Sequence, residues 1–283
     1  MSLYQIIFLA IIQGAAELLP VSSSAHVIVA EKLMGLDPSS PEMTFLLVML
    51  HTGTMFAVLV YFWSRWKKLD LDFLKSIFIT TAITGVVGLG LKKFIEKVIM
   101  ERLLGESHAE IENLFKSLPL IAFSLLCVGL LIIFADLRKK KAGKAKLETR
   151  TSILIGVVQG LCLPFRGFSR SGATISTGLL TGVSRSHSED FSFALAVVLT
   201  PPVVVLELHR LLKASQSVGL EALGLGHLLL PGLLGMIFSF AAGLLALRWL
   251  SAWLEGGRWK YFGFYCILAS LGVASLEAFW FTQ

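Results

Sequence analysis

Six stretches of the chain consist almost entirely of apolar residues and are long enough to cross a membrane as helices. They are Phe45–Trp63, Phe73–Leu91, Leu118–Leu137, Phe191–Leu208, Leu228–Leu247 and Tyr261–Phe281. The hydrocarbon core of a bilayer is ~30 Å thick, and a helix crosses it with ~20 residues. We therefore expect an all-α polytopic integral membrane protein with six transmembrane helices. Pro201 and Pro202 are expected to break or kink the fourth of them.

Two further stretches are apolar but interrupted by polar residues, and they lie about half the chain apart. The first reads IIQGAAELLPVSSSAHVIVAEKLMG, from Ile11 to Gly35, and the second reads VVQGLCLPFRGFSRSGATISTGLLTG, from Val157 to Gly182. Each contains a Gln-Gly pair, then Leu-Pro, a serine-rich turn and an apolar run that ends at Gly. A duplicated pair of broken segments points to a binding site between two repeats near the membrane midplane.

The two broken segments are best explained as re-entrant helix–loop–helix hairpins, at about 5–36 and about 152–182. Each half of a hairpin is too short to span the bilayer. Broken backbone at membrane depth is tolerated only where protein buries it or where it lines a wet cavity. The alternative, that each segment crosses the membrane once with a proline kink, stays open.

The charges of the loops predict the orientation of the helices. The linker 138–150 is strongly basic, which places it in the cytoplasm by the positive-inside rule. The loop 92–116 mixes both signs and suits the outside. Three spans on each side of the basic linker give two repeats of opposite topology, residues 1–137 and 151–283. The two hairpins then enter from opposite faces, which lets their tips meet.

Composition narrows the class of protein further. Of the 283 residues 55% are hydrophobic and 16% charged, whereas soluble domains are about 25% charged. The net charge of +6 would suit a nucleic-acid partner, but the basic residues sit in short loops, so we expect no such partner. We expect no signal peptide, because Met1–Leu9 lacks a basic start. The cysteines Cys127, Cys162 and Cys266 lie in apolar stretches and are expected to be unpaired.

The first tip combines one carboxylate with several polar groups. Gln13 and Glu17 are four residues apart and share one helix face, and Pro20 ends that helix. Glu17 would hold a hard divalent cation through oxygen or orient His26. Ionisable groups in hydrocarbon are costly and usually mark a site.

A serine-rich turn opens the next helix of the first tip. Ser22, Ser23 and Ser24 offer hydroxyls beside free backbone N–H groups, which together bind phosphate oxygens. His26 lies in the first turn of that helix. Because its side chain titrates near neutral pH, it suits general acid–base chemistry.

The second tip again joins small hydroxyl residues to the start of a helix. These residues are Ser169, Ser171 and Thr174. Arg170 adds a permanently charged, planar donor that matches phosphate geometry. Arg166 is a second candidate for phosphate binding, although its long side chain also suits snorkelling towards the membrane surface.

Each polar residue also has a structural explanation. Gln13 and Glu17 would bond each other across helices, and the serines would bond back to their own backbone. His26 would be a satisfied interhelical donor, and Arg170 would be a cytoplasmic anchor. Together these explanations are weaker than each one alone, because four costly polar features would have to occur independently in two related segments of the chain.

The motifs resemble the signature motifs of the bacterial undecaprenyl pyrophosphate phosphatases, also called bacitracin resistance proteins. The matching residues are Gln13-x-x-x-Glu17, the run Pro20–His26 and the run Gly167–Thr174. The resemblance implies a membrane enzyme that removes the terminal phosphate of C55 isoprenyl diphosphate and so regenerates the lipid carrier for peptidoglycan. It implies catalytic roles for Glu17, Ser23, His26 and Arg170. Phosphate would be bound by Ser22, Ser24, Ser169, Ser171 and Thr174.

The resemblance also implies a divalent cation, Mg²⁺ or Ca²⁺, held by Glu17 and Gln13. It implies a bacterial inner-membrane protein whose active site opens to the periplasm, and it leaves a homodimer open. Two departures stand out. The first motif position, which is Glu or Gln in the family, is Gln13 here, so the motif keeps one carboxylate. The family usually has Pro directly before the Gly of the second motif, whereas here Phe165 and Arg166 separate Pro164 from Gly167.

A rival function belongs to a different class of protein. A lipid-carrier flippase or transporter would also need inverted repeats and alternating access, but the motifs favour the enzyme. The sequence leaves open whether Ser23 attacks phosphorus or activates a water molecule. Phosphate release in detergent would separate the two classes.

Overall fold

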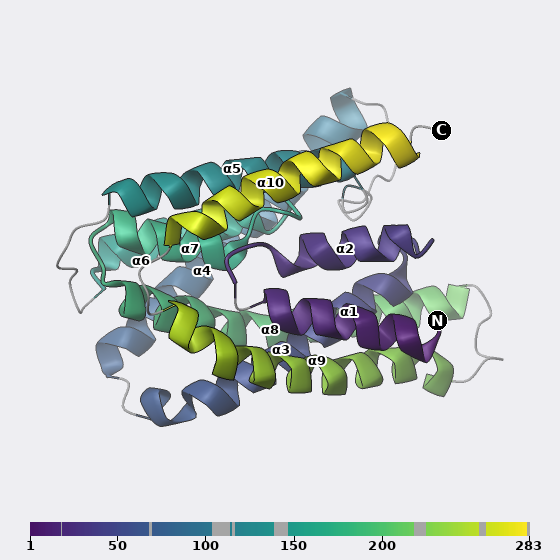
Figure 1. The fold of residues 1–283 in the computed structure, drawn as a ribbon, viewed down its shortest axis with the longest axis horizontal. Helices are drawn as coiled ribbons and strands as arrows, with labels where there is room; N and C mark the ends of the chain where they lie inside the picture. Colours follow the sequence, from purple (N-terminus) through teal and green to yellow (C-terminus); the bar gives the residue numbers. More distant parts are fainter. Residues whose placement is uncertain are drawn as a thin grey trace. The chain divides into compact units, whose positions relative to one another are not determined.

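The computed structural model describes residues 1–17, 19–67, 70–103, 114, 117–138, 147–217, 225–254 and 259–281, and these residues form helices without a strand (Figure 1). In chain order the helices are α1 Leu3–Ala16, α2 Ser23–Leu33, α3 Pro41–Trp66, α4 Leu71–Phe94, η1 Ile95–Leu103, α5 Leu118–Arg138, α6 Thr149–Cys162, α7 Arg170–Leu180, α8 Arg185–Ser217, α9 Leu225–Leu254, α10 Trp259–Leu276 and η4 Glu277–Phe281. The all-α expectation is confirmed.

Six of the described helices are long and apolar enough to cross a membrane, as the apolar runs predict. They are α3, α4 continued by η1, α5, α8, α9 and α10 with its continuation into η4. The fourth span is not broken at its proline pair, because α8 continues through Pro201 and Pro202. The hydroxyl of Thr200, the residue before the proline pair, donates to the Ala196 carbonyl at 2.7 Å.

The chain divides into two compact units. The first consists of Met1–Leu18, Ser23–Ser64 and Ala196–Gly256, and the second of Leu19–Ser22, Arg65–Leu195 and Gly257–Gln283. Each unit therefore draws helices from both predicted repeats. The predicted boundaries at 137 and 151 stay a prediction. The loop 106–112 and the basic run 139–146, on which the orientation rests, lie outside the described residues.

In the first unit α1 packs against both α2 and α9. Figure 1 shows α1 and α2 side by side and running in opposite directions, so the first broken segment folds back on itself as a hairpin. Gly14 permits the contact with α9, because a Cβ there would lie 2.5 Å from the Ala242 Cβ. The helix α3 is joined to α9 by the Ser239 hydroxyl, which donates to the Leu50 carbonyl at 2.8 Å.

In the second unit α6 packs against α4 and α7, and α10 packs along α5. Buried polar groups join α4 to α6. The Thr84 hydroxyl donates to the Gly156 carbonyl at 3.2 Å and accepts from Gln159 Nε2 at 3.0 Å. The seam between α5 and α10 is close at Gly129 and Gly263, where a Cβ on either would lie under 3 Å from the carbonyl oxygen of the other.

The two broken segments have matching local structure. The helices α1 and α6 both have 14 residues, and α2 and α7 both have 11. A glycine of positive φ lies two residues after the end of each second helix, Gly35 at 73° and Gly182 at 89°. The first helix of each segment packs on the second span of the other predicted repeat, since α1 contacts α9 and α6 contacts α4. These matches are what a duplicated fold requires; its inverted orientation in a membrane stays a prediction.

Candidate active site

One carboxylate oxygen gathers the polar groups of the first tip. Glu17 Oε2 accepts a hydrogen bond from Gln13 Nε2 at 2.8 Å and from the Ser23 hydroxyl at 2.5 Å. Glu17 caps the C-terminus of α1, and Ser23 is the first residue of α2. The break in the hairpin therefore turns the chain so that the serine meets the carboxylate. The contact between Gln13 and Glu17 confirms that the four-residue spacing puts them on one face.

A histidine that sequence reasoning missed faces the same carboxylate. His51, on α3, places Nε2 at 3.4 Å from Glu17 Oε2, and its Nδ1 lies 2.7 Å from the Leu47 carbonyl oxygen. The available signal was a lone ionisable residue within the apolar run 45–63. That is the same signal that drew attention to Glu17.

The loop that precedes Ser23 has an unusual backbone. Ser22 has φ of 65°, the left-handed region that residues other than glycine rarely adopt, and its side chain is buried. Within the second unit this loop packs against the start of α7 and against α10. A Cβ at Gly172 would lie 3.1 Å from the Pro20 carbonyl oxygen, and Cys266 Sγ lies 3.5 Å from that oxygen.

The second tip opens α7 with a serine cap. The Ser169 hydroxyl accepts from the Gly172 backbone N–H at 3.2 Å and lies 3.3 Å from the Ser171 hydroxyl. Arg170 is half-buried, and its Nη1 donates to the Ser192 carbonyl at 3.2 Å. The Thr174 hydroxyl lies 2.7 Å from the Ser192 hydroxyl. Ser192 thus holds the arginine, and nothing in the sequence signalled a role for its backbone carbonyl.

The other predicted residues of the first tip follow Ser23 directly in the chain. Ser24 and His26 are half-buried on the first turn of α2, and His26 is three residues after Ser23, which puts both on one face. The structure therefore gathers Gln13, Glu17 and Ser23, and separately Ser169, Arg170, Ser171 and Thr174. The prediction that Ser23 and Arg170 flank one phosphate stays a prediction, because they belong to different units.

The first tip has some of the donors that a divalent cation needs. Gln13 is fully buried, and its Oε1 accepts no hydrogen bond from any described residue. A buried amide oxygen beside a carboxylate is a ligand set suited to Mg²⁺ or Ca²⁺. The described residues contain no cluster of three or more His, Cys, Asp or Glu side chains placed to hold a metal. Glu17 and Gln13 would therefore hold a cation only if substrate oxygens and water supplied its remaining ligands.

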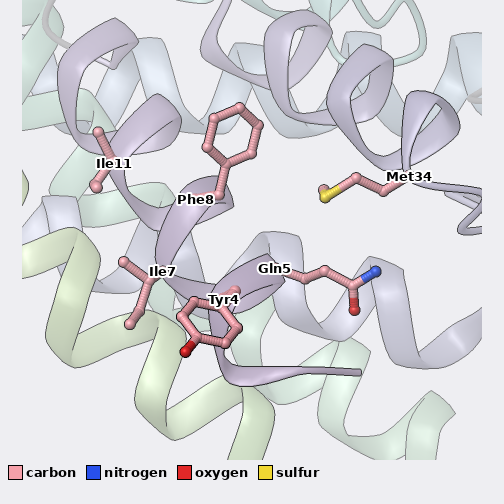
Figure 2. A pocket seen from close by; sticks show the side chains of 6 residues that line it. All are labelled: Tyr4, Gln5, Ile7, Phe8, Ile11 and Met34. Atoms are coloured by element: carbon pink, nitrogen blue, oxygen red, sulfur yellow. The ribbon is translucent and has the colours of Figure 1, made fainter.

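A pocket with a mostly apolar lining lies beside the start of α1. It measures about 430 Å³ and is formed by the start of α1 and the residue after α2 (Figure 2). Its lining is mostly apolar: Tyr4, Gln5, Ile7, Phe8, Ile11 and Met34. None of the predicted site residues lines it.

Comparison with known proteins decides the family. Residues 6–272 match the family described as bacitracin resistance protein BacA. The chain belongs to the bacitracin resistance protein family. It is 57% identical to undecaprenyl-diphosphatase 2 of Acinetobacter baylyi, over 98% of both chains. It is 32% identical to undecaprenyl-diphosphatase 2 of Burkholderia orbicola and 33% identical to undecaprenyl-diphosphatase 1 of Burkholderia pseudomallei. Each of these matches covers 96% of this chain and 95% of the relative.

Proposed function

We propose that the protein is a membrane phosphatase that hydrolyses undecaprenyl diphosphate to undecaprenyl phosphate and inorganic phosphate. The reaction would recycle the lipid carrier for peptidoglycan synthesis and give bacitracin resistance. The observation that carries the proposal is the Ser23 hydroxyl, which donates to the Glu17 carboxylate at 2.5 Å where α2 begins. Membership of a family whose relatives are undecaprenyl-diphosphatases supports the substrate.

The start of α2 is arranged to bind the terminal phosphate. The first backbone N–H groups of a helix have no partner inside the helix and carry partial positive charge, so they favour an anion. Ser22 and Ser24 flank Ser23 and add hydroxyl donors. The terminal phosphate would then be held against the Ser23 hydroxyl.

Glu17 is placed to take the proton from the nucleophile. As the Ser23 oxygen attacks the terminal phosphorus, its proton passes along the existing hydrogen bond to Glu17 Oε2. The bond between phosphorus and the bridging oxygen breaks, and undecaprenyl phosphate leaves. Water then hydrolyses the phosphoserine: Glu17 returns its proton to the serine oxygen as the bond between that oxygen and phosphorus breaks, and both protons of the attacking water leave on the released phosphate. Direct attack by a water held by Ser23 would use the same carboxylate.

Arg170 and His26 would serve the charges that develop during the reaction. The Arg170 guanidinium would stabilise charge on the phosphate oxygens. Ser169, Ser171 and Thr174 form hydrogen bonds at the start of α7, which carries Arg170. His26 would give a proton to the leaving phosphate.

The divalent cation, Mg²⁺ or Ca²⁺, would be held by Glu17 and the Gln13 amide oxygen together with diphosphate oxygens. When bound, it would neutralise charge on the diphosphate. The site would open to the periplasmic side of the inner membrane, with the isoprenyl tail lying in the bilayer. The rival flippase function needs no serine hydrogen-bonded to a half-buried carboxylate, and this pair favours the enzyme.

The test is phosphate release from C55 diphosphate in detergent by the wild type and by Ser23→Ala. We expect release by the wild type and a loss of at least 10²-fold in the variant, as for removal of a catalytic nucleophile or base. Wild-type protein that binds the lipid but releases no phosphate would instead favour the flippase.

The shared phosphate has a test of its own. A double cysteine variant, Ser23→Cys with Arg170→Cys in a background without the native cysteines, should cross-link with a short bifunctional thiol reagent. Bound inorganic phosphate should slow the reaction. A pair that never cross-links would separate the second tip from the chemistry.

A further inference from the structure

The ring of His51 is held in the orientation of a metal ligand. A backbone carbonyl can only accept, so the 2.7 Å contact with the Leu47 carbonyl places the hydrogen on Nδ1. In the neutral ring, Nε2 would present its lone pair, and this atom lies 3.4 Å from Glu17 Oε2. Metal-binding histidines typically donate their other ring N–H to a carbonyl or carboxylate, which fixes the tautomer.

A cation between Nε2 of the neutral ring and Glu17 Oε2 would be shared by both atoms. Two ligand atoms at ~2.1 Å from one cation lie about 3.0–3.4 Å apart for ligand angles of roughly 90–110°. The observed 3.4 Å falls within this range. A second observation points to the same ligand, since the fully buried Gln13 has an amide oxygen that accepts no hydrogen bond among the described residues.

We propose that His51 is a nitrogen ligand of the divalent cation, which it would hold with the Glu17 carboxylate and the Gln13 amide oxygen. The inference deepens the proposed function, because it concerns the same site. Gln13 leaves the site with one carboxylate, and His51 supplies the further donor. A mixed nitrogen and oxygen site binds transition metals more tightly than an all-oxygen site does, since imidazole suits them and Mg²⁺ prefers oxygen.

The experiment measures metal binding directly, without lipid substrate. Mn²⁺ bound to the detergent-solubilised full chain is examined by pulsed electron paramagnetic resonance, which detects a directly coordinated imidazole nitrogen. We expect nitrogen coupling in the wild type, its loss in His51→Gln, and no change in His209→Gln, which alters an exposed histidine on α8. Calorimetry should show Co²⁺ binding more tightly than Mg²⁺, with an affinity loss for Co²⁺ of at least about 10–100-fold in His51→Gln.

The alternative is that His51 Nε2 carries a proton and donates a hydrogen bond to Glu17. Mn²⁺ binding without nitrogen coupling, coupling that persists in His51→Gln, or no binding at all would each overturn the proposal. If His51→Gln does not fold, His51→Asn is the second variant, and a wild-type spectrum without nitrogen coupling still refutes the idea. Phosphate release by the wild type with Mg²⁺ is measured separately, so failure of the enzyme function and failure of the metal assignment are distinguishable.

Discussion

At the scale of single residues, Glu17 makes the central contacts of the first tip, because its Oε2 contacts an amide, a hydroxyl and an imidazole. Glu17→Gln keeps the size of the side chain but removes the negative charge that accepts the serine proton. We expect phosphate release to fall by about 10²–10⁴-fold, as for loss of a general base. The control is Glu148→Gln, an exposed position at the start of α6 whose side chain makes no cap hydrogen bond. Equal activity of Glu17→Gln and the wild type would contradict the proposed mechanism.

His26→Ala should lose most of the activity, by about 10²–10⁴-fold, if the ring gives a proton to the leaving group. A substrate with a better leaving group needs that proton less. The loss should therefore shrink when an activated phosphate ester replaces the lipid diphosphate. A loss of the same size for both substrates would argue for a structural role.

Arg170→Ala should lower turnover by about 10²–10³-fold, because charge that builds on the phosphate loses a fixed donor. Arg170→Lys should restore only part of it, since an ammonium group cannot make the bidentate contact. Steady-state phosphate release measures both variants, with Arg150→Ala at an exposed position as the control. Full activity in Arg170→Ala would remove the second tip from the reaction.

Sequence reasoning located the residues near Glu17 but not all of its neighbours. The four-residue spacing and the break at Pro20 sufficed to bring Gln13 and Ser23 to the carboxylate. His51 comes from a span whose side-chain directions depend on how helices pack, and sequence periodicity does not give that packing. The Ser192 carbonyl is a backbone group, so no residue type marks it.

At the scale of elements, the turn before α7 depends on Gly167. Its φ is 98°, and a Cβ there would lie 2.6 Å from the Ile121 carbonyl oxygen. Gly167→Ala should lower the free energy of unfolding by about 1–3 kcal/mol from backbone strain alone, with crowding adding to the loss. Thermal denaturation in detergent measures this change.

Gly85→Ala is the matched control, because a Cβ at Gly85 meets nothing within 4 Å and the residue lies inside α4. Alanine there should be neutral or stabilising by up to ~1 kcal/mol. Similar melting temperatures for the two variants would show that the turn tolerates a side chain.

The apolar runs located all six long helices, because length and hydropathy are properties of local sequence. The ends were less predictable. The helix α8 begins at Arg185 rather than at Phe191, since its first residues are held by ion pairs such as Arg185 Nε with Glu189 at 2.7 Å. Hydropathy gives no account of such polar turns.

At the scale of the whole molecule, the orientation of the chain is open to direct measurement. A single cysteine at position 108 or 110 in a cysteine-free background should react with an impermeant thiol reagent added outside cells. One at position 140 or 144 should react only after the membrane is opened, because basic loops stay in the cytoplasm. The reverse pattern would place the proposed site on the cytoplasmic side.

The partners of the first loop come very late in the chain. Pro20 lies against α7 and against Cys266, and the latter contact closes across 246 residues. At the usual pace of about 5–20 residues per second, the ribosome needs on the order of 10–50 s to make that much chain. For that time the carboxylate-bearing hairpin lacks the helix that contacts its turn. We therefore expect activity only once α10 has been made, so a chain truncated before α10 should contain the whole serine motif and yet be inactive.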